Sequence, residues 1–242
     1  VAQLTEWVYD KQGRLTDTYD ALRNNVHVVY DDVNNKTLER NPRGKETLYE
    51  YDEANNLKVV REPLGKVTRF VREADDHGYD EVGNNVWMQN PRGFEFSFEY
   101  DMFNNRRIVN DPLGGVTETR FDPEGNKIYH KAPRTAATTF EYDRVNRLRF
   151  TKQPLNITTE VQYDKAGNRT FIIGPALQSE FDNPAAYVQI DKTQNIYGAG
   201  NRVVETVNRL GHSTWYQYDL LGNLEREINA RLHAVSYQYD EL

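Results

Sequence analysis

An aromatic residue followed by Asp, or a variant of that pair, recurs along the sequence at an almost constant spacing. The aromatic members, called marker residues below, are Tyr9, Tyr30, Tyr51, Tyr79, Tyr100, Phe121, Tyr142, Tyr163, Tyr197, Tyr218 and Tyr239. Eight of the ten intervals are 21 residues long, and the other two are 28 and 34. Such a period is typical of repeat arrays. The sequence therefore predicts a single repeat array over residues 1–242, of about eleven units, with insertions near 71–78 and 174–190.

A turn is expected directly after each marker residue. Asp usually follows the marker, and its side chain can accept hydrogen bonds from the backbone two residues further on. The fourth residue after the marker is always Gly or Asn, the residues that adopt a positive φ at least cost: Gly13, Asn34, Asn55, Gly83, Asn104, Gly125, Asn146, Gly167, Asn201 and Gly222. This pattern predicts a type I turn followed by a bulge, with a strand on either side.

A second turn is expected in the other half of the unit, where a Pro lies 12 residues after the marker. The motifs are NPRG from Asn41, EPLG from Glu62, NPRG from Asn90, DPLG from Asp111 and QPLN from Gln153. Pro presets φ at the second position of such a turn, so we expect the DPLG turn to follow the same logic as the first turn. Each unit then consists of strand, turn, strand and turn.

Between the turns, rings alternate with polar residues, as in Tyr49, Glu50 and Tyr51. Alternation with a period of two places the rings on one face of a strand. A looser series lies eight residues after the marker: Leu38, Val59, Trp87, Ile108, Tyr129, Phe150 and Phe171. We therefore expect an all-β fold, an antiparallel β-meander of 21-residue units wound into a spiral sheet, as in a shell or barrel segment. Rings of neighbouring units should pack together and replace an aliphatic core.

Composition limits the classes of partner. The net charge of −7 argues against a broad basic face, so we expect no nucleic-acid partner. The chain lacks Cys. It also has no apolar run of about 18 residues, so we expect no membrane span. It has no signal-peptide pattern and starts and stops inside a repeat, which suggests a segment of a longer protein.

No catalytic, cofactor-binding or metal-binding residue is predicted. The four serines lie outside any nucleophile motif, and the five histidines lack metal-ligand spacing; they are Ser97, Ser179, Ser213, Ser236, His27, His77, His130, His212 and His233. The repeated Asp has a geometric role in every turn, which is poor grounds for one catalytic pair. We therefore expect a protein that is not an enzyme.

Four other features of the sequence require interpretation. Residues 72–81 gather Glu73, Asp75, Asp76, Asp80 and Glu81, and form either a solvated acidic loop or a Ca²⁺ site. The segment 174–190 is either a contact loop or a plug or corner of the sheet. N-x-[ST] triplets begin at Asn35, Asn156 and Asn168, a number close to chance. The exposed tyrosines are either packing surface or a platform for sugar rings.

The combination of YDxxG with DPLG or NPRG at a period of 21 resembles the RHS, or YD, repeat family over nearly the whole chain, best near Tyr100, Tyr142, Tyr163 and Tyr218. The five Asn-containing turns, and the second turns around Arg23, Thr135 and Leu232, depart from the family pattern and indicate a diverged array.

The resemblance implies a β-sheet shell that encloses a C-terminal toxin domain, as in bacterial polymorphic toxins and insecticidal toxin complexes, or a barrel like that of the teneurins. It also implies a secreted or cell-surface protein whose partners are the enclosed toxin polypeptide or neighbouring repeats of the parent chain. The core motif that precedes the toxin in that family is absent, so no catalytic residue can be assigned. The alternative is an extracellular adhesion module or carbohydrate-binding module, with glycans as partners.

Overall fold

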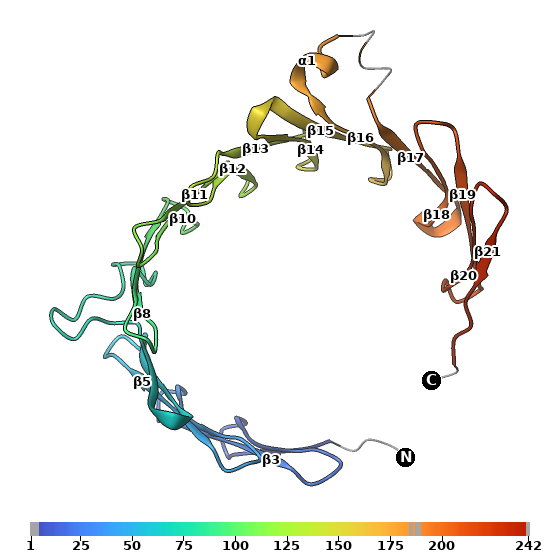
Figure 1. Cartoon of the computed structure of the whole chain (residues 1–242). Helices are drawn as coiled ribbons and strands as arrows, with labels where there is room; N and C mark the ends of the chain where they lie inside the picture. Colours follow the sequence, from blue (N-terminus) through green and yellow to red (C-terminus); the bar gives the residue numbers. More distant parts are fainter. Residues whose placement is uncertain (1–4, 184–185, 187–189, 241–242) are drawn as a thin grey trace. The chain divides into compact units, whose positions relative to one another are not determined.

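The structure is a computed structural model that describes residues 5–183, 186 and 190–240 (Figure 1). These residues form 21 strands, one short α-helix and three single-turn 3-10 helices. The predicted all-β class is therefore confirmed. The helices are α1 (Gln178–Phe181), η1 (Pro63–Gly65), η2 (Pro154–Asn156) and η3 (Ala199–Asn201).

The chain divides into two compact units, Val1–Glu118 (unit 1) and Thr119–Leu242 (unit 2), and the division falls within β11. Unit 1 contains β1 (Glu6–Tyr9), β2 (Leu15–Tyr19), β3 (Asn25–Tyr30), β4 (Lys36–Arg40), β5 (Glu46–Tyr51), β6 (Leu57–Glu62), β7 (Lys66–Arg69), β8 (Trp87–Gln89), β9 (Glu95–Tyr100), β10 (Arg106–Asn110) and the start of β11 (Val116–Phe121). Unit 2 continues with β12 (Lys127–Lys131), β13 (Thr138–Tyr142), β14 (Leu148–Gln153), β15 (Ile157–Tyr163), β16 (Arg169–Leu177), β17 (Lys192–Tyr197), β18 (Val203–Val207), β19 (Ser213–Tyr218), β20 (Leu224–Ile228) and β21 (Ala234–Ser236). The single array over residues 1–242 stays a prediction.

Within each unit, every strand pairs antiparallel with the next strand in the chain. This is the predicted meander. The register shifts by one residue beside the marker, for example between Val29 and Tyr30 and between Gln217 and Tyr218. These shifts are the bulges that the turn pattern predicts.

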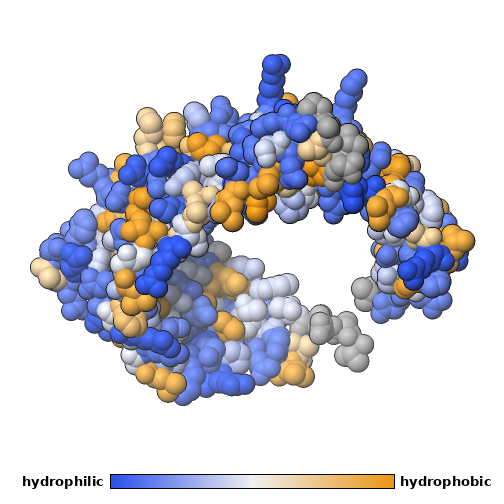
Figure 2. Space-filling model, turned by 45° about the horizontal axis from the view of Figure 1, so that its top comes forward, coloured by the Kyte–Doolittle hydropathy of each residue, from blue (hydrophilic) through white to orange (hydrophobic). Residues whose placement is uncertain are grey.

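The sheet is a single layer with two different faces. Direct cross-strand pairs such as Tyr49 with Val60 define the tyrosine face, which carries the marker residues. Pairs such as Glu50 with Val59 define the glutamate face, which carries the residue before each marker and the series eight residues after it. Apolar side chains are scattered in small groups among polar ones over the surface seen in Figure 2. A single layer thus leaves most side chains only partly buried.

The deepest burial lies at the two insertions. The apolar residues that are almost fully buried are Val59, Val71, Trp87, Ile173 and Ile190, and the buried polar residues are Thr158 and Glu160. Val71 and Ile190 belong to the insertions, whereas the other five lie on strands of the glutamate face. Each insertion projects from the strand ribbon of its own unit (Figure 1). The insertions therefore supply the second layer that small hydrophobic cores need.

The second insertion begins later than the sequence suggests. β16 runs on through Gly174, and Ala176 and Leu177 still pair with Thr158 and Ile157. α1 follows directly, and residues 184, 185 and 187–189 lie outside the described part of the chain. The ladder is therefore not interrupted at Gly174, because this stretch extends a hairpin instead of forming a turn.

Candidate functional surface: the two turn edges

The turns after the markers, which form the edge called the YD edge below, share one hydrogen-bond pattern wherever they begin with Asp. In the turn at Asp164, the backbone N–H of Gly167 donates to the Asp164 carbonyl (3.2 Å), and the Asp164 N–H donates to the carbonyl of Asn168 (3.0 Å). The Asp164 carboxylate accepts from the N–H of Asn168 (2.8 Å) and from its Nδ2 (2.9 Å). All ten predicted Gly or Asn positions have φ between 56° and 93°. The predicted turn type is confirmed at the nine turns that begin with Asp. At Gly198, which has no capping side chain, Gly200 and Asn201 both have a positive φ, and the turn is of a different type.

Side-chain amides connect one YD turn to the next. Asn35 Nδ2 donates to Asn55 Oδ1 (3.0 Å), one turn further along. The same link, called the amide link below, joins Asn84 to Asn104, Asn126 to Asn146 and Asn168 to Asn201, and Arg14 donates to Asn34 in the same way. Each of the five Asn turns that depart from the family pattern thus accepts a hydrogen bond that Gly could not. Their Asn is a structural component of the edge.

The marker tyrosines connect the units through their hydroxyl groups. Tyr163 donates to the carbonyl of Leu148 (2.8 Å), 15 residues earlier, which lies at the bulge opposite the previous marker. This tyrosine link recurs at Tyr30, Tyr51, Tyr79, Tyr100, Tyr142, Tyr197, Tyr218 and Tyr239. A bulge disrupts the hydrogen-bond ladder locally. The tyrosine hydroxyl therefore donates to a backbone carbonyl at the bulge.

Cationic groups cover many of the rings. The Arg147 guanidinium lies 4.5 Å from the ring centre of Tyr163, and that of Arg14 lies 5.0 Å from the ring centre of Tyr30. Further cations lie over Tyr49, Trp87, Phe98, Tyr129, Phe140, Phe150 and Tyr218. The sequence did not predict this component of the packing. A ring face that holds a cation cannot also stack on a sugar, so these contacts favour the packing role of the rings.

Hydrogen bonds lower the pKa of several YD aspartates and so favour their charged form. The side chain of Asn168 lowers the pKa of Asp164, and the side chain of Asn223 does the same for Asp219. At Asp31, desolvation raises the pKa but is outweighed by donation from the following residues, so the pKa is lowered there too. These carboxylates are occupied by the turn, which leaves them unsuited to general acid catalysis near neutral pH.

The turns in the other half of the unit, which form the edge called the Pro edge below, fall into two classes. Where Asp or Asn stands first, as at Asp111 and Asn90, its Oδ1 accepts from the backbone two and four residues on, and one residue has a positive φ. Where Glu62 or Gln153 stands first, no side-chain cap forms, and two successive residues have positive φ, including Leu64 and Leu155. The expected logic of the DPLG turn is therefore confirmed, whereas the EPLG and QPLN turns differ because the longer side chain does not form the cap.

The three irregular turns of the Pro edge behave differently from one another. Arg23 (φ 64°) and Leu232 (φ 62°) adopt the left-handed conformation without being Gly, in turns that Asp20 and Asn229 cap. In the turn at Thr135, which begins with Ala132, the positive φ lies one residue earlier, at Arg134 (φ 61°). A capping side chain at the first position therefore keeps the turn in register even when the Gly is missing.

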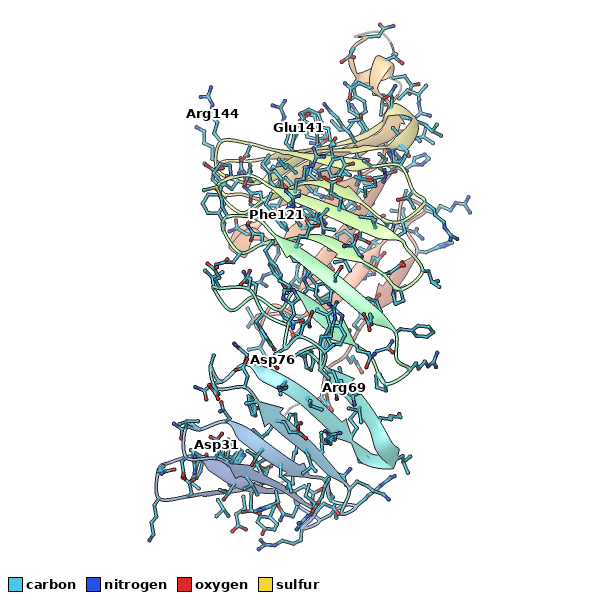
Figure 3. The ribbon with its side chains drawn as sticks, turned by 90° about the vertical axis from the view of Figure 1, so that its left-hand side faces the viewer. Asp31, Arg69, Asp76, Phe121, Glu141 and Arg144 are labelled. Carbon is cyan, nitrogen blue, oxygen red and sulfur yellow. The ribbon has the colours of Figure 1, made fainter. Side chains whose placement is uncertain are left out.

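Three carboxylates of the acidic first insertion form ion pairs with basic side chains. Glu73 pairs with Arg69 (2.8 Å) and Asp76 with Lys58 (2.8 Å); Arg69 and Asp76 are labelled in Figure 3. Asp75 pairs with Arg72 (3.3 Å). In residues 5–183, 186 and 190–240, no group of three His, Asp or Glu side chains is placed to hold a metal ion. The geometry favours the solvated acidic loop over a Ca²⁺ site.

Two of the N-x-[ST] asparagines are already engaged. Asn35 Nδ2 donates to Asp31 and Asn55, and Asn168 Nδ2 donates to Asp164 and Asn201. Asn156 sits at a positive φ in η2.

Within the described part of the chain, no helix is both long enough and apolar enough to cross a bilayer.

No family model and no curated protein matches this sequence. Among solved structures, it is similar to a chain in the crystal structure of TcdB2–TccC3–Cdc42, with a TM-score of 0.62 and 12% identity over 94% of this chain. A TcdB2–TccC3 crystal structure gives a TM-score of 0.60 at 12% identity, and a Tc holotoxin pore of Photorhabdus luminescens gives 0.50 at 14%, again over 94% of this chain. This chain spans only 14% of each of those chains. The likeness shows that this chain has the fold of a segment of these Tc toxin chains.

Proposed function

We propose that this chain is a non-enzymatic wall segment of an RHS-repeat shell that encloses a toxin polypeptide, in a secreted or cell-surface protein. The observation that carries the proposal is the repeated connection between units, in which each marker tyrosine links its unit to the unit before it. A wall needs such lateral connections at every step, whereas a catalytic site needs one special position. The repeat signature resembles RHS proteins, and the shared fold with Tc toxin chains supports the same role.

The geometry of the repeated groups supports a structural role over a catalytic one. The aspartates cap turns, the tyrosine hydroxyls bind carbonyls, and the asparagine amides join neighbouring turns. Among residues 5–183, 186 and 190–240, no single unit differs from the others by gathering a nucleophile, a base and an oxyanion hole. The adhesion alternative has no observation of comparable weight, since cations cover many of the rings that would stack on sugars.

Protease protection in the parent chain tests the proposal. We expect the polypeptide that the shell encloses to resist a protease while the array is intact. The variant Gly167→Val, which strains one turn, should make that polypeptide accessible, whereas Gly167→Asn should preserve protection. Equal cleavage of the polypeptide in the intact chain and in the Val variant would overturn the enclosing role.

A further inference from the structure

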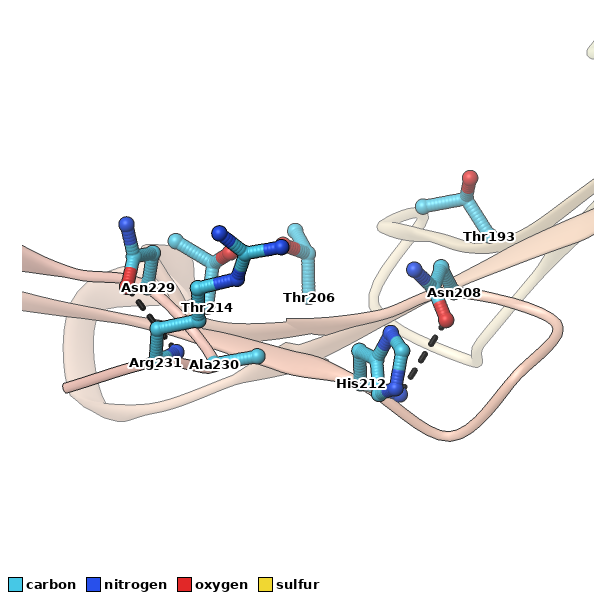
Figure 4. Close-up of a pocket in the computed structure, with 8 residues that line it drawn as sticks. All are labelled: Thr193, Thr206, Asn208, His212, Thr214, Asn229, Ala230 and Arg231. Carbon is cyan, nitrogen blue, oxygen red and sulfur yellow. Dashed lines mark hydrogen bonds between the residues drawn. The ribbon is translucent and has the colours of Figure 1, made fainter.

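A polar hollow of about 400 Å³ lies in unit 2, beside two successive turns of the Pro edge (Figure 4). The turns begin at Asn208 and Asn229, and the floor between them includes Thr206 and Thr214. These two threonines pair directly across β18 and β19, on the tyrosine face. The hollow therefore joins two rigid strands to two capped turns within a single compact unit.

The turn caps make the hollow rich in hydrogen-bond donors. Asn208 Oδ1 accepts from the N–H groups of Leu210 (2.9 Å) and His212 (3.1 Å). Asn229 Oδ1 likewise accepts from Arg231 (3.0 Å) and His233 (3.1 Å). An amide whose oxygen is used in this way has its Nδ2 group left as a donor. Both asparagines thus offer N–H groups, not oxygens, to a ligand.

Arg231 adds a positive charge that the protein does not neutralise. Its guanidinium forms no ion pair within the described residues, and Figure 4 shows it on the same side of the strands as Thr206 and Thr214. None of the residues that line the hollow is Asp or Glu. In a chain with a net charge of −7, a carboxylate-free hollow with an unpaired Arg is a place where an anion is favoured.

Threonine hydroxyls provide the other hydrogen-bonding groups of the hollow. Thr193, Thr206 and Thr214 line the hollow, and their hydroxyls can both donate and accept. Such groups pair well with the hydroxyls of a polyol, while a guanidinium with two amide donors suits the planar oxygens of a carboxylate. The volume is that of a small ligand and not of a peptide chain.

We propose that this hollow binds an acidic sugar, with the oxyanion on Arg231 and the two asparagine amides and the sugar hydroxyls on the threonines. The site is separate from the enclosing role, since it uses none of the tyrosine links or amide links. It also differs from a platform of stacked tyrosines, because no ring face is involved.

Titration followed by NMR shift changes tests the site, with glucuronate, glucose and inorganic sulfate as probes. Glucuronate should shift the backbone signals around Asn208 and Asn229, and neutral glucose should bind roughly tenfold more weakly because it lacks the charge-assisted bonds. Sulfate should bind less tightly than glucuronate. If sulfate binds as tightly, the hollow is an inorganic anion site and the sugar assignment is wrong.

Variants separate this hollow from general surface charge. Arg231→Gln should weaken glucuronate binding about tenfold, and Thr214→Val should weaken it while leaving sulfate binding unchanged. Arg92→Gln is the matched control, because Arg92 holds the same third position in the turn that begins at Asn90. Loss of binding in the control, or unchanged binding in Arg231→Gln with an intact circular dichroism spectrum, would overturn the proposal. The protease-protection result does not depend on any of these outcomes.

Discussion

The turns at both edges of the sheet reverse the chain between strands, but different contacts hold them. At the YD edge, the residue four positions after the turn's first residue is Asn or Arg, and at several turns its side chain reaches both its own turn and the following one, as at Asn168. At the Pro edge, the corresponding residues include Lys45, Phe94 and Gly115, whose side chains cannot form an amide link. Within each unit, several turns of the YD edge are therefore connected to the next one, whereas the turns of the Pro edge are each held separately.

The difference explains where the array tolerates change. The first insertion follows β7 and the second follows β16, each between a proline 12 residues after a marker and the next marker, and the ten YD turns keep one length. Non-Gly residues with positive φ at the Pro edge include Leu64, Leu155 and Leu232, which the YD edge does not use. An edge whose turns contact one another constrains every turn, and an edge of separate turns constrains each one only locally.

Acid should produce the largest effect, and mainly through the YD edge. A lowered pKa in the folded state gives stability that is present above the unfolded pKa of about 4 and is lost as the pH falls through the folded value. The YD aspartates with lowered pKa are Asp10, Asp31, Asp80, Asp101, Asp143, Asp164 and Asp219, whereas the Pro edge relies on neutral Asn at four turns. The melting temperature should therefore stay nearly flat from pH 7 to about 5 and fall steeply below pH 4.

The variant Asp164→Asn sharpens this expectation. Asn keeps the Oδ1 acceptor, as it does in the Pro-edge turns, but takes up no proton. Its melting temperature should fall less between pH 5 and pH 3 than that of the parent protein. An identical slope would show that Asp164 does not contribute to the acid sensitivity.

Gly167→Val should cause the largest loss among single substitutions at neutral pH. Gly167 has φ 92°, and an added Cβ meets no atom within 4 Å, so only backbone strain opposes the change. A β-branched residue in this conformation should cost about 2 kcal/mol of the free energy of unfolding. The midpoint of urea unfolding measures the loss, and Gly167→Asn is the control that should lose much less. An unchanged midpoint in the Val variant would contradict the turn assignment.

Tyr163→Phe tests the connection between units. Removing the hydroxyl leaves the Leu148 carbonyl without its donor and should cost about 1 kcal/mol. Tyr129→Phe is the matched control, since Tyr129 lies on the glutamate face under Arg120 and has no comparable link. Equal losses in the two variants would mean that the hydroxyl link adds nothing to ring packing.

The sequence predicts the period, the turns and the strand alternation because these are local properties, set by residues within one unit. It does not predict the partners of the tyrosine hydroxyl, which lie 15 residues away across the sheet. A signal was present: ten of the eleven markers are Tyr and one is Phe, although packing alone would accept either ring. From the sequence alone, Asn34 and Asn55 indicate divergence, because the side chains that bind them belong to the turn before them. The hollow near Arg231 could not be predicted, since it depends on two turns and two strands together.

The amide link allows the finest test of the two edges. Asn55→Gly keeps a residue suited to φ 66° but removes the acceptor for Asn35, and should cost about 0.5 kcal/mol. Asn156→Gly, at φ 59° on the Pro edge, removes no such link and should be neutral or slightly stabilising. Native-state hydrogen exchange resolves the difference: amides near Asn35 should exchange faster in the first variant only. If both variants behave alike, the YD edge is no more connected than the Pro edge, and the constant length of the YD turns needs another cause.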